Sequence, residues 1–228
     1  MTTRGRRRGK IIAIDGPAGV GKSTVGHLVA RRLGYHFINT GEMFRALAWK
    51  ALDRGVPVED FRAVDRLAVI LKWEFRPSPD GTLKTFIDGE NVAPFLRDER
   101  VSAASSAVAA NPGVRRFMCR LQRRLGAGGA IVMEGRDIGT HVFPDADHKI
   151  YLDADVGERA LRRYRQLKAS GEKARLQQVR EAMLKRDLND LRRKINPLSL
   201  ASDAVVVDST HLTLREVADT IVRMVRKA

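Results

Sequence analysis

Residues 11–23 read "IIAIDGPAGVGKS", a short apolar run that breaks into a glycine-rich loop. The run from Ile11 to Ile14 has no polar alternation, which is typical of a parallel strand buried on both faces. Residues 16–23 fit the pattern G-x-x-x-x-G-K-[ST], and the amphipathic stretch that follows predicts a helix ending at Gly34. This strand–loop–helix order predicts a P-loop, whose backbone N–H groups turn toward phosphate oxygens.

The loop predicts a site for a nucleoside triphosphate, and we expect ATP. Its lysine would place a charge at the β and γ phosphates, and its serine hydroxyl would ligate Mg²⁺. The residues predicted to bind ATP here are Gly16, Gly19, Gly21, Lys22, Ser23 and Thr24, with Ser23 as the metal ligand. The loop alone does not name a reaction, because ATPases, GTPases, helicases and small-molecule kinases share it. The sequence contains no guanine-reading N-K-x-D, and a helicase usually needs a longer chain.

The rest of the chain alternates strand-like and helix-like segments. Short strands are predicted within 35–41, 129–137, 148–155 and 204–210, and amphipathic helices follow them. Residues 73–92 alternate around a Pro-Asp-Gly turn, which predicts a β-hairpin. The length suits one α/β domain with embellishments or two small domains, and repeated strand–helix units predict a parallel sheet covered by helices on both faces. Ligands of such sheets bind at the carboxyl ends of the strands.

Composition narrows the classes of partner. The 228 residues carry a net charge of +15, which suits either nucleic acid or a small substrate with several phosphates. Aromatic residues make up only 6% of the chain, and basic residues cluster only in Arg4–Lys10, so we expect no specific nucleic-acid partner. No apolar run reaches the roughly 18 residues of a membrane helix, and none resembles a secretory leader. We therefore expect a cytoplasmic protein without a membrane partner.

A kinase of a small molecule needs a second anion site, and three stretches supply arginines for one. Arg45 follows the second predicted strand, and Arg136 follows the strand "AIVM". In "RDLNDLRR", residues 186–193, Arg186, Asp190 and Arg193 stand at i, i+4 and i+7, on one face of a helix. Taken alone, each is also compatible with an ordinary ion pair or a solvated helix surface.

Seven stretches together resemble the bacterial cytidylate kinases, which make CDP from CMP. They are "IIAIDGPAGVGKSTV", "NTGEMFR", "SAVAANPGVR", "EGRDIGTHVFPDADHKIYLDA", "ERALRRYRQL", "RDLNDLRR" and "SDAVVVDST". They run in the family's order from residue 11 to the end of the chain. The resemblance implies a P-loop kinase with an inserted monophosphate-binding subdomain and a helical lid. It also implies ATP and Mg²⁺, with CMP and dCMP as acceptors.

The resemblance also implies roles for individual residues. Arg45 and Arg136 would hold the acceptor phosphate, because a guanidinium donates two bonds to one phosphate. The remaining implied acceptor contacts are Thr40, where the family usually has a serine or threonine, Ser106, Arg115 and Asp137 at the cytosine, Arg186 and Asp190 at the ribose, and Arg193 at the base or phosphate nearby. In the lid, Arg159, Arg162 and Arg163 would close over ATP. The implied catalytic set is Lys22, Arg136, Arg159 and Arg163.

The expected organisation follows from this alignment. Residues 1–9 form a basic disordered tail, residues 10–40, 127–155 and 195–228 the P-loop core, residues 41–126 the monophosphate-binding subdomain, and residues 156–194 the lid and its connecting helix. The chain departs from the family's usual residues at Asn39, Glu42 and Phe44. We expect a monomer. UMP, AMP or shikimate remain alternative acceptors, and a nucleic-acid-binding P-loop protein remains the alternative from another class.

Overall fold

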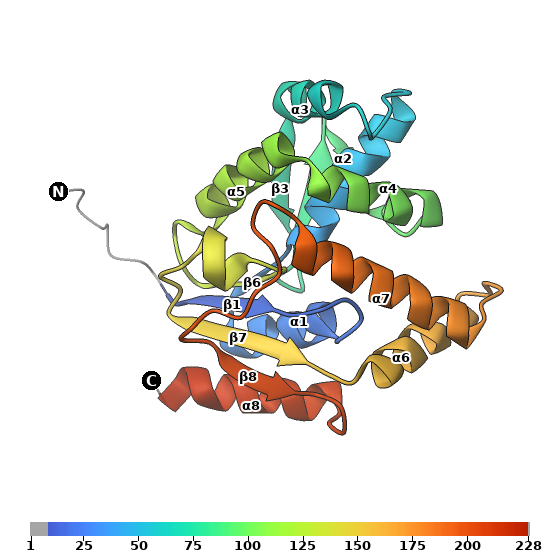
Figure 1. The fold of residues 1–228 in the computed structure, drawn as a ribbon. Coiled ribbons are helices and arrows are strands. Elements are labelled where there is room, and N and C mark those ends of the chain that lie inside the picture. The colour runs from blue at the N-terminus through green and yellow to red at the C-terminus, as the bar shows by residue number, and fades with distance from the viewer. Residues whose placement is uncertain (1–8, 228) are drawn as a thin grey trace.

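The protein is described by a computed structural model that covers residues 9–227 (Figure 1). Its centre is a five-stranded parallel sheet in the order β2-β6-β1-β7-β8. These strands are β1 (Ile11–Asp15), β2 (His36–Asn39), β6 (Ile131–Glu134), β7 (His148–Asp153) and β8 (Val205–Asp208). β1 lies in the middle, so the P-loop that follows it emerges between neighbouring strands. The predicted parallel sheet is confirmed.

Alternate side chains of β1 enter two separate cores, as expected for a strand covered on both faces. Ile12 and Ile14 pack with α1 (Lys22–Leu33) and α8 (Leu214–Lys227). Ile11 and Ala13 face the other core. That core includes residues of α2 (Thr40–Asp53), α3 (Phe61–Ile70), α4 (Glu99–Ala110) and α5 (Pro112–Gly126). The absence of polar alternation in "IIAI" therefore reflects burial from both sides.

A second, antiparallel sheet lies between α3 and α4 in the chain. It consists of β3 (Trp73–Pro77), β4 (Leu83–Ile87) and β5 (Glu90–Asn91). The predicted hairpin at 73–92 is confirmed, whereas the third strand and the short helix η1 (Ala93–Phe95) were not predicted. A strand of two residues is too short to show an alternating pattern. The hairpin turn contacts the main sheet, because the Phe37 N–H donates to the Gly81 carbonyl at 3.0 Å.

Two long helices pair beside the sheet, toward the right in Figure 1. They are α6 (Val156–Ala169) and α7 (Leu176–Arg192), and both lie within residues 156–194, where the lid and its connecting helix are predicted. Between them is a small core of their own, formed by Ala160, Leu167, Val179 and Met183. Assignment of 156–194 as a lid, and of 41–126 as a subdomain, stays a prediction.

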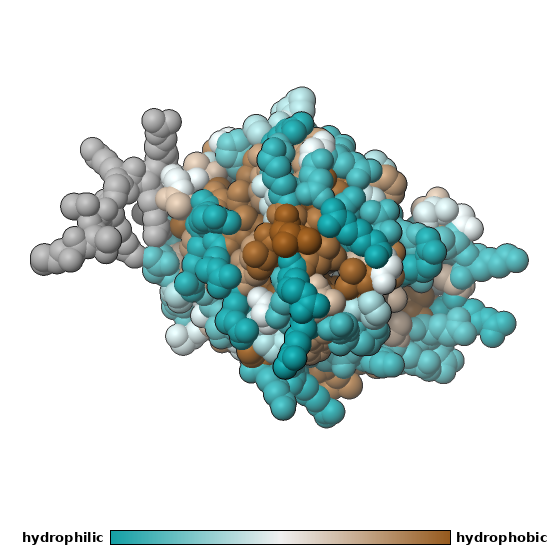
Figure 2. Space-filling model, turned by 90° about the horizontal axis from the view of Figure 1, so that it is seen from above, coloured by the Kyte–Doolittle hydropathy of each residue, from teal (hydrophilic) through white to brown (hydrophobic). Residues whose placement is uncertain are grey.

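The face seen from above in Figure 2 is mostly hydrophilic, with apolar residues near its centre. Two apolar side chains of α3 are highly exposed: Val69 and Ile70, with 65% and 70% of their surface exposed. Over residues 9–227, no helix combines the length and the apolar character needed to cross a membrane. The predicted disorder of residues 1–9 concerns residues 1–8, which lie outside the described part of the chain.

Candidate active site

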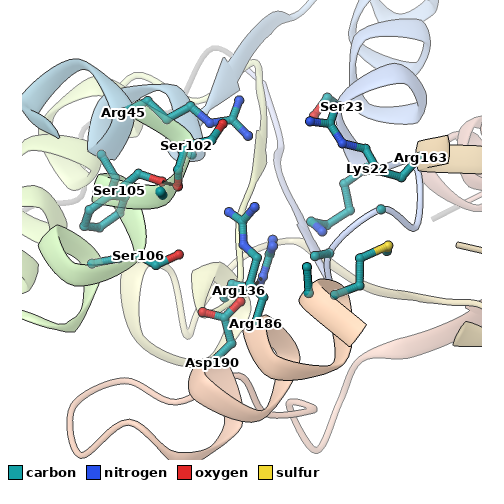
Figure 3. A pocket seen from close by; sticks show the side chains of 18 of the residues that line it. Lys22, Ser23, Arg45, Ser102, Ser105, Ser106, Arg136, Arg163, Arg186 and Asp190 are labelled. Carbon is teal, nitrogen blue, oxygen red and sulfur yellow. Dashed lines mark hydrogen bonds and ion pairs between the residues drawn. The ribbon is translucent and has the colours of Figure 1, made fainter. Parts of the chain in front are cut away.

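A cavity opens at the carboxyl ends of β1, β2 and β6, where the strand order predicts a ligand site. Its volume is about 710 Å³, within the range of small-molecule sites. In Figure 3, Lys22, Ser23 and Arg163 lie on one side and Arg45 with Ser106 on the other. The side chains of Arg136, Arg186 and Asp190 lie between them. The cavity thus has a P-loop side and an arginine-rich side that face each other.

The P-loop backbone takes the shape that its glycines permit. Gly19 and Gly21 have φ values of 73° and 99°, in the left-handed region that favours glycine. A Cβ atom on Gly16 would lie 2.0 Å from the carbonyl oxygen of Leu152, so only glycine allows this approach to β7. The loop ends at the first residue of α1, whose N-terminal N–H groups supply positive partial charge.

Lys22 is buried at the floor of the cavity. Its ammonium donates to the carbonyl oxygens of Gly16 and Pro17, at 2.9 and 2.7 Å. Burial, followed by the positive charge of Arg136, lowers the pKa of Lys22 to about 7. A negatively charged ligand would stabilise this buried ammonium group, and its binding would raise the pKa of Lys22 toward the usual value.

Ser23 faces a carboxylate that the sequence did not single out. Its hydroxyl donates to Glu134 Oε1 at 2.5 Å, and the Asn39 amide lies 3.5 Å from the same hydroxyl. Among the described residues, no cluster of three acidic, histidine or cysteine side chains would hold a metal alone. Mg²⁺ commonly takes one or two protein oxygens and completes its shell with phosphates and water. Ser23 and Glu134 fit that donor set.

The arginine-rich side is held together by alternating charges. Arg115 donates to Asp137 at 2.6 Å, and Asp137 lies 3.9 Å from Arg193. Arg193 pairs with Asp190 at 3.1 Å, and Asp190 accepts from Arg136 Nε at 2.8 Å. Residues from α5, the end of β6 and α7 are thereby joined in one chain of ion pairs. The Arg115–Asp137 pair is the most buried, with side chains 4% and 10% exposed.

Three further arginines line the cavity with no hydrogen bond or ion pair to any described residue: Arg45, Arg163 and Arg186. Burial lowers the pKa of Arg186 to about 10, and the nearby charge of Arg136 adds to this effect. Burial also lowers the pKa of Arg45. Crowded guanidinium groups without partners indicate a site for an anion with several oxygens.

Asp15, the last residue of β1, connects the P-loop to the arginine-rich side. Its two carboxylate oxygens accept from the backbone N–H groups of Ile138 and Gly139, at 2.9 and 2.7 Å. These residues open the π-helical turn η2 (Ile138–Val142), directly after Arg136 and Asp137. Burial raises the pKa of Asp15 to about 6, against the two backbone hydrogen bonds that lower it. Sequence patterns could not predict this contact, because the partners of Asp15 lie more than a hundred residues away in the chain.

Most predicted site residues meet at the cavity. The exceptions among them are Gly16, Arg159 and Arg162; those that line the cavity are Gly19, Gly21, Lys22, Ser23, Thr24, Thr40, Arg45, Ser106, Arg115, Arg136, Asp137, Arg163, Arg186, Asp190 and Arg193. Thr40 lines the cavity, and its hydroxyl donates to the Glu134 carbonyl at 2.7 Å. Convergence at one cavity is consistent with the predicted roles, which remain predictions.

Two of the three predicted lid arginines, Arg159 and Arg162, do not line the cavity in this structure. The Arg159 guanidinium bonds to Asp187 and to the carbonyl oxygens of Ala18 and Ala154. The Arg162 guanidinium bonds to Glu158 and to the backbone after β8. In this structure both groups are bound to protein partners, and their contact with ATP stays a prediction. Arg163 alone of the three lines the cavity.

The three residues that depart from the usual family pattern have structural partners here. The Asn39 side chain accepts from the Glu42 N–H at 3.2 Å and so caps α2. Its amide also donates to the Glu42 carboxylate at 3.3 Å. Phe44 presents its ring to the Arg115 guanidinium, 5.5 Å from the ring centroid. These contacts support the N-terminus of α2 and the arginine-rich side.

A P-loop on a parallel sheet, facing an arginine-lined cavity, defines a P-loop kinase. The family model for cytidylate kinase matches residues 12–227, and the chain belongs to the cytidylate kinase family. A cytidylate kinase from Geobacillus thermodenitrificans (strain NG80-2) is 47% identical over 216 residues, which cover 95% of this chain and 96% of that protein.

Other relatives are longer. A bifunctional pantoate ligase/cytidylate kinase from Synechococcus sp. (strain JA-3-3Ab) is 46% identical over 226 residues. The match covers 98% of this chain but 42% of that protein, so the chain spans less than half of such relatives. Among solved structures, an uncharacterized protein from Eubacterium ventriosum ATCC 27560 aligns with a TM-score of 0.51 and 12% identity, covering 96% of this chain and 99% of that one. That likeness concerns the fold alone.

Proposed function

We propose that the protein transfers the γ-phosphoryl group of ATP to CMP, giving ADP and CDP, and that it also accepts dCMP. One observation carries the proposal: Arg45 and Arg186, which have no hydrogen bond or ion pair with the described residues, line the same cavity as the P-loop. Membership of the cytidylate kinase family supports the choice of acceptor.

On the donor side, the P-loop N–H groups and Lys22 would bind the β and γ phosphates of ATP. Lys22 would exchange the carbonyl oxygens of Gly16 and Pro17 for phosphate oxygens. Ser23 and Glu134 would hold Mg²⁺, which neutralises charge on the phosphates when bound. Arg163, which has no protein partner among the described residues, would neutralise charge on the transferred group.

On the acceptor side, Arg45 and Arg136 would orient the phosphate of CMP in line with the γ-phosphoryl group. No general base is required, because an oxygen of the monophosphate is already ionised at neutral pH. Positioning and charge neutralisation then supply most of the catalysis, as is usual for phosphoryl transfer. Closure of the cavity would exclude water and limit hydrolysis of ATP.

Ser106, Arg115 and Asp137 would read the cytosine, and Arg186 would lie against the sugar side. Asp190 has both oxygens engaged, one by Arg136 and one by Arg193. A 2′-hydroxyl is therefore not needed to satisfy this carboxylate, which supports acceptance of dCMP as well as CMP.

The test is a coupled assay of ADP release with ATP and Mg²⁺ and each of CMP, dCMP, UMP, AMP and shikimate in parallel. We expect fast turnover with CMP and dCMP and little with the other acceptors. Slow ADP release that does not depend on the acceptor would refute the kinase proposal. Fast turnover with another acceptor alone would keep the reaction class and replace CMP.

The expected monomer and cytoplasmic location stay predictions. Sedimentation of the purified chain, with and without ATP and CMP, tests the first, and cell fractionation tests the second.

A further inference from the structure

Side chains of two helices, α6 and α7, hydrogen-bond to the P-loop at Ala18. The Ala18 N–H donates to Asp187 Oδ1 at 3.0 Å, and the Ala18 carbonyl accepts from Arg159 Nη1 at 3.0 Å. Arg159 Nη1 also pairs with Asp187 Oδ2 at 2.5 Å. One peptide segment of the loop is therefore held on its donor and its acceptor group at once, by α7 and α6 respectively.

The pair is buried and almost fully satisfied. The Arg159 and Asp187 side chains are 8% and 11% exposed, and Arg159 Nε has a further partner in the Ala154 carbonyl at 3.0 Å. Burying opposite charges is costly unless each is paired and hydrogen-bonded, and both conditions hold here. Such a pair specifies a relative position of the elements that it joins.

Apolar packing fixes the same contact. A Cβ atom on Gly19 would lie 2.4 Å from the terminal methyl group of Met183, so α7 reaches the loop one residue after Ala18. Met183 belongs to the small core shared by α6 and α7. The two helices therefore approach the P-loop as one body.

The position of Asp187 on α7 links this contact to the acceptor side. Arg186 precedes it and Asp190 follows one turn later, and both line the cavity. A helix is stiff over one turn, so a shift of Asp187 against Ala18 moves Arg186 and Asp190 relative to Lys22.

We propose that Arg159 and Asp187 are positioning residues that join the P-loop to the acceptor-binding face of α7. Neither side chain lines the cavity in this arrangement. They set the separation between the phosphates of ATP and the arginines that hold the acceptor. The inference rests on the proposed function for its kinetic consequences, but the contact itself can be tested without turnover.

The kinetic test compares Asp187→Asn with the double variant Arg159→Met/Asp187→Leu. Replacing a buried ion pair by apolar side chains of similar size often preserves stability. The double variant leaves no buried charge without its partner, but the Ala18 N–H and carbonyl lose theirs, so we expect a folded protein with a lowered melting temperature. In that folded protein we expect a KM for CMP raised about tenfold or more, with a lower kcat. A folded double variant with the wild-type KM for CMP would overturn the proposal, because the pair would then be structural only.

Glu181→Gln is the matched control. It also converts an acid to an amide on α7, but Glu181 is exposed and its partner is Gln177, away from the cavity. Its KM for CMP should stay at the wild-type value.

A second measurement uses the unmodified protein. Amide hydrogen exchange of Ala18 should be as slow as that of β1, because its N–H is buried against Asp187. Exchange at the rate of an open loop would refute the contact whatever the activity. Slow exchange in a protein that does not phosphorylate CMP would instead refute the proposed function and leave the contact standing.

Discussion

The two sides of the cavity are built in opposite ways. The P-loop side uses backbone groups from eight consecutive residues, 16–23, and a single buried lysine. The arginine-rich side uses side chains from α2, α5, the end of β6 and α7, held by a chain of ion pairs. Changes on the first side should affect chemistry with little loss of stability, whereas changes in the ion pairs of the second side should affect stability as well.

The largest expected effect is on stability, from Arg115→Leu. It removes the partner of Asp137, whose other cationic neighbour, Arg193, lies at 3.9 Å. Leaving a buried charge without its partner costs about 3–5 kcal/mol. Urea unfolding measures this loss, and Arg116→Leu, at the exposed neighbouring position, should change the unfolding free energy little. Equal losses for the two variants would mean that the ion-pair chain does not hold the arginine-rich side together.

Lys22→Ala tests the P-loop side. We expect kcat to fall by about 10²–10³, the usual effect of removing one preorganised charge from a transition state. The unfolding free energy should change by about 1 kcal/mol or less, because the loss of two hydrogen bonds is offset by removing a buried charge. The coupled assay and urea unfolding on the same preparation check both values. A large loss of stability would contradict the contrast between the two sides.

The two sides of the cavity also differ in how far they could be predicted from the sequence. The P-loop was predicted in full, because its pattern is contiguous and its flanking strand and helix are visible in the hydrophobic pattern. Arg45 and Arg136 could be placed because side chains after parallel strands gather at one edge of the sheet. Their assignment to an acceptor phosphate, however, came only from the resemblance to cytidylate kinases.

The features that could not be predicted from the sequence are individual contacts between residues far apart in the chain. Asp187 lies inside the quoted "RDLNDLRR", but it is one residue from Arg186 and therefore about 100° around the helix. Its partner Ala18 is 169 positions away. No spacing rule connects such residues, and the same holds for Ser23 with Glu134. Arg159 and Arg163 share a helix face in the sequence pattern, but in the structure Arg163 lines the cavity whereas Arg159 binds Asp187.

Arg186→Ala sharpens the comparison within the arginine-rich side. Arg186 makes no hydrogen bond or ion pair with the described residues, so its loss should leave stability nearly unchanged. We expect a rise in the KM for CMP and a fall in kcat that together lower kcat/KM for CMP about 10- to 100-fold, the value of a charged hydrogen bond or two. ATP binding should be unaffected. Arg192→Ala, at an exposed position on the same helix, is the control. Unchanged CMP kinetics in Arg186→Ala would mean that Arg186 belongs to an ordinary helix surface.

The smallest expected effect concerns protons at Lys22. Its pKa in the free protein is lowered to about 7, so at pH 8 most of the molecules carry a neutral amine. Phosphate oxygens favour the ammonium form and raise the pKa, so ATP binding at pH 8 should take up about one proton. The bound state then holds more protons than the free state, and the affinity for ATP should weaken as pH rises above 7.

Calorimetry in two buffers of different ionisation enthalpy measures the proton uptake. In Lys22→Arg the guanidinium stays charged at this pH, so the uptake due to this side chain should vanish, while any contribution from ATP itself is common to both proteins. Equal uptake in the two proteins would show that Lys22 is already charged before the phosphates arrive, and that the P-loop side is preorganised in charge as well as in backbone shape.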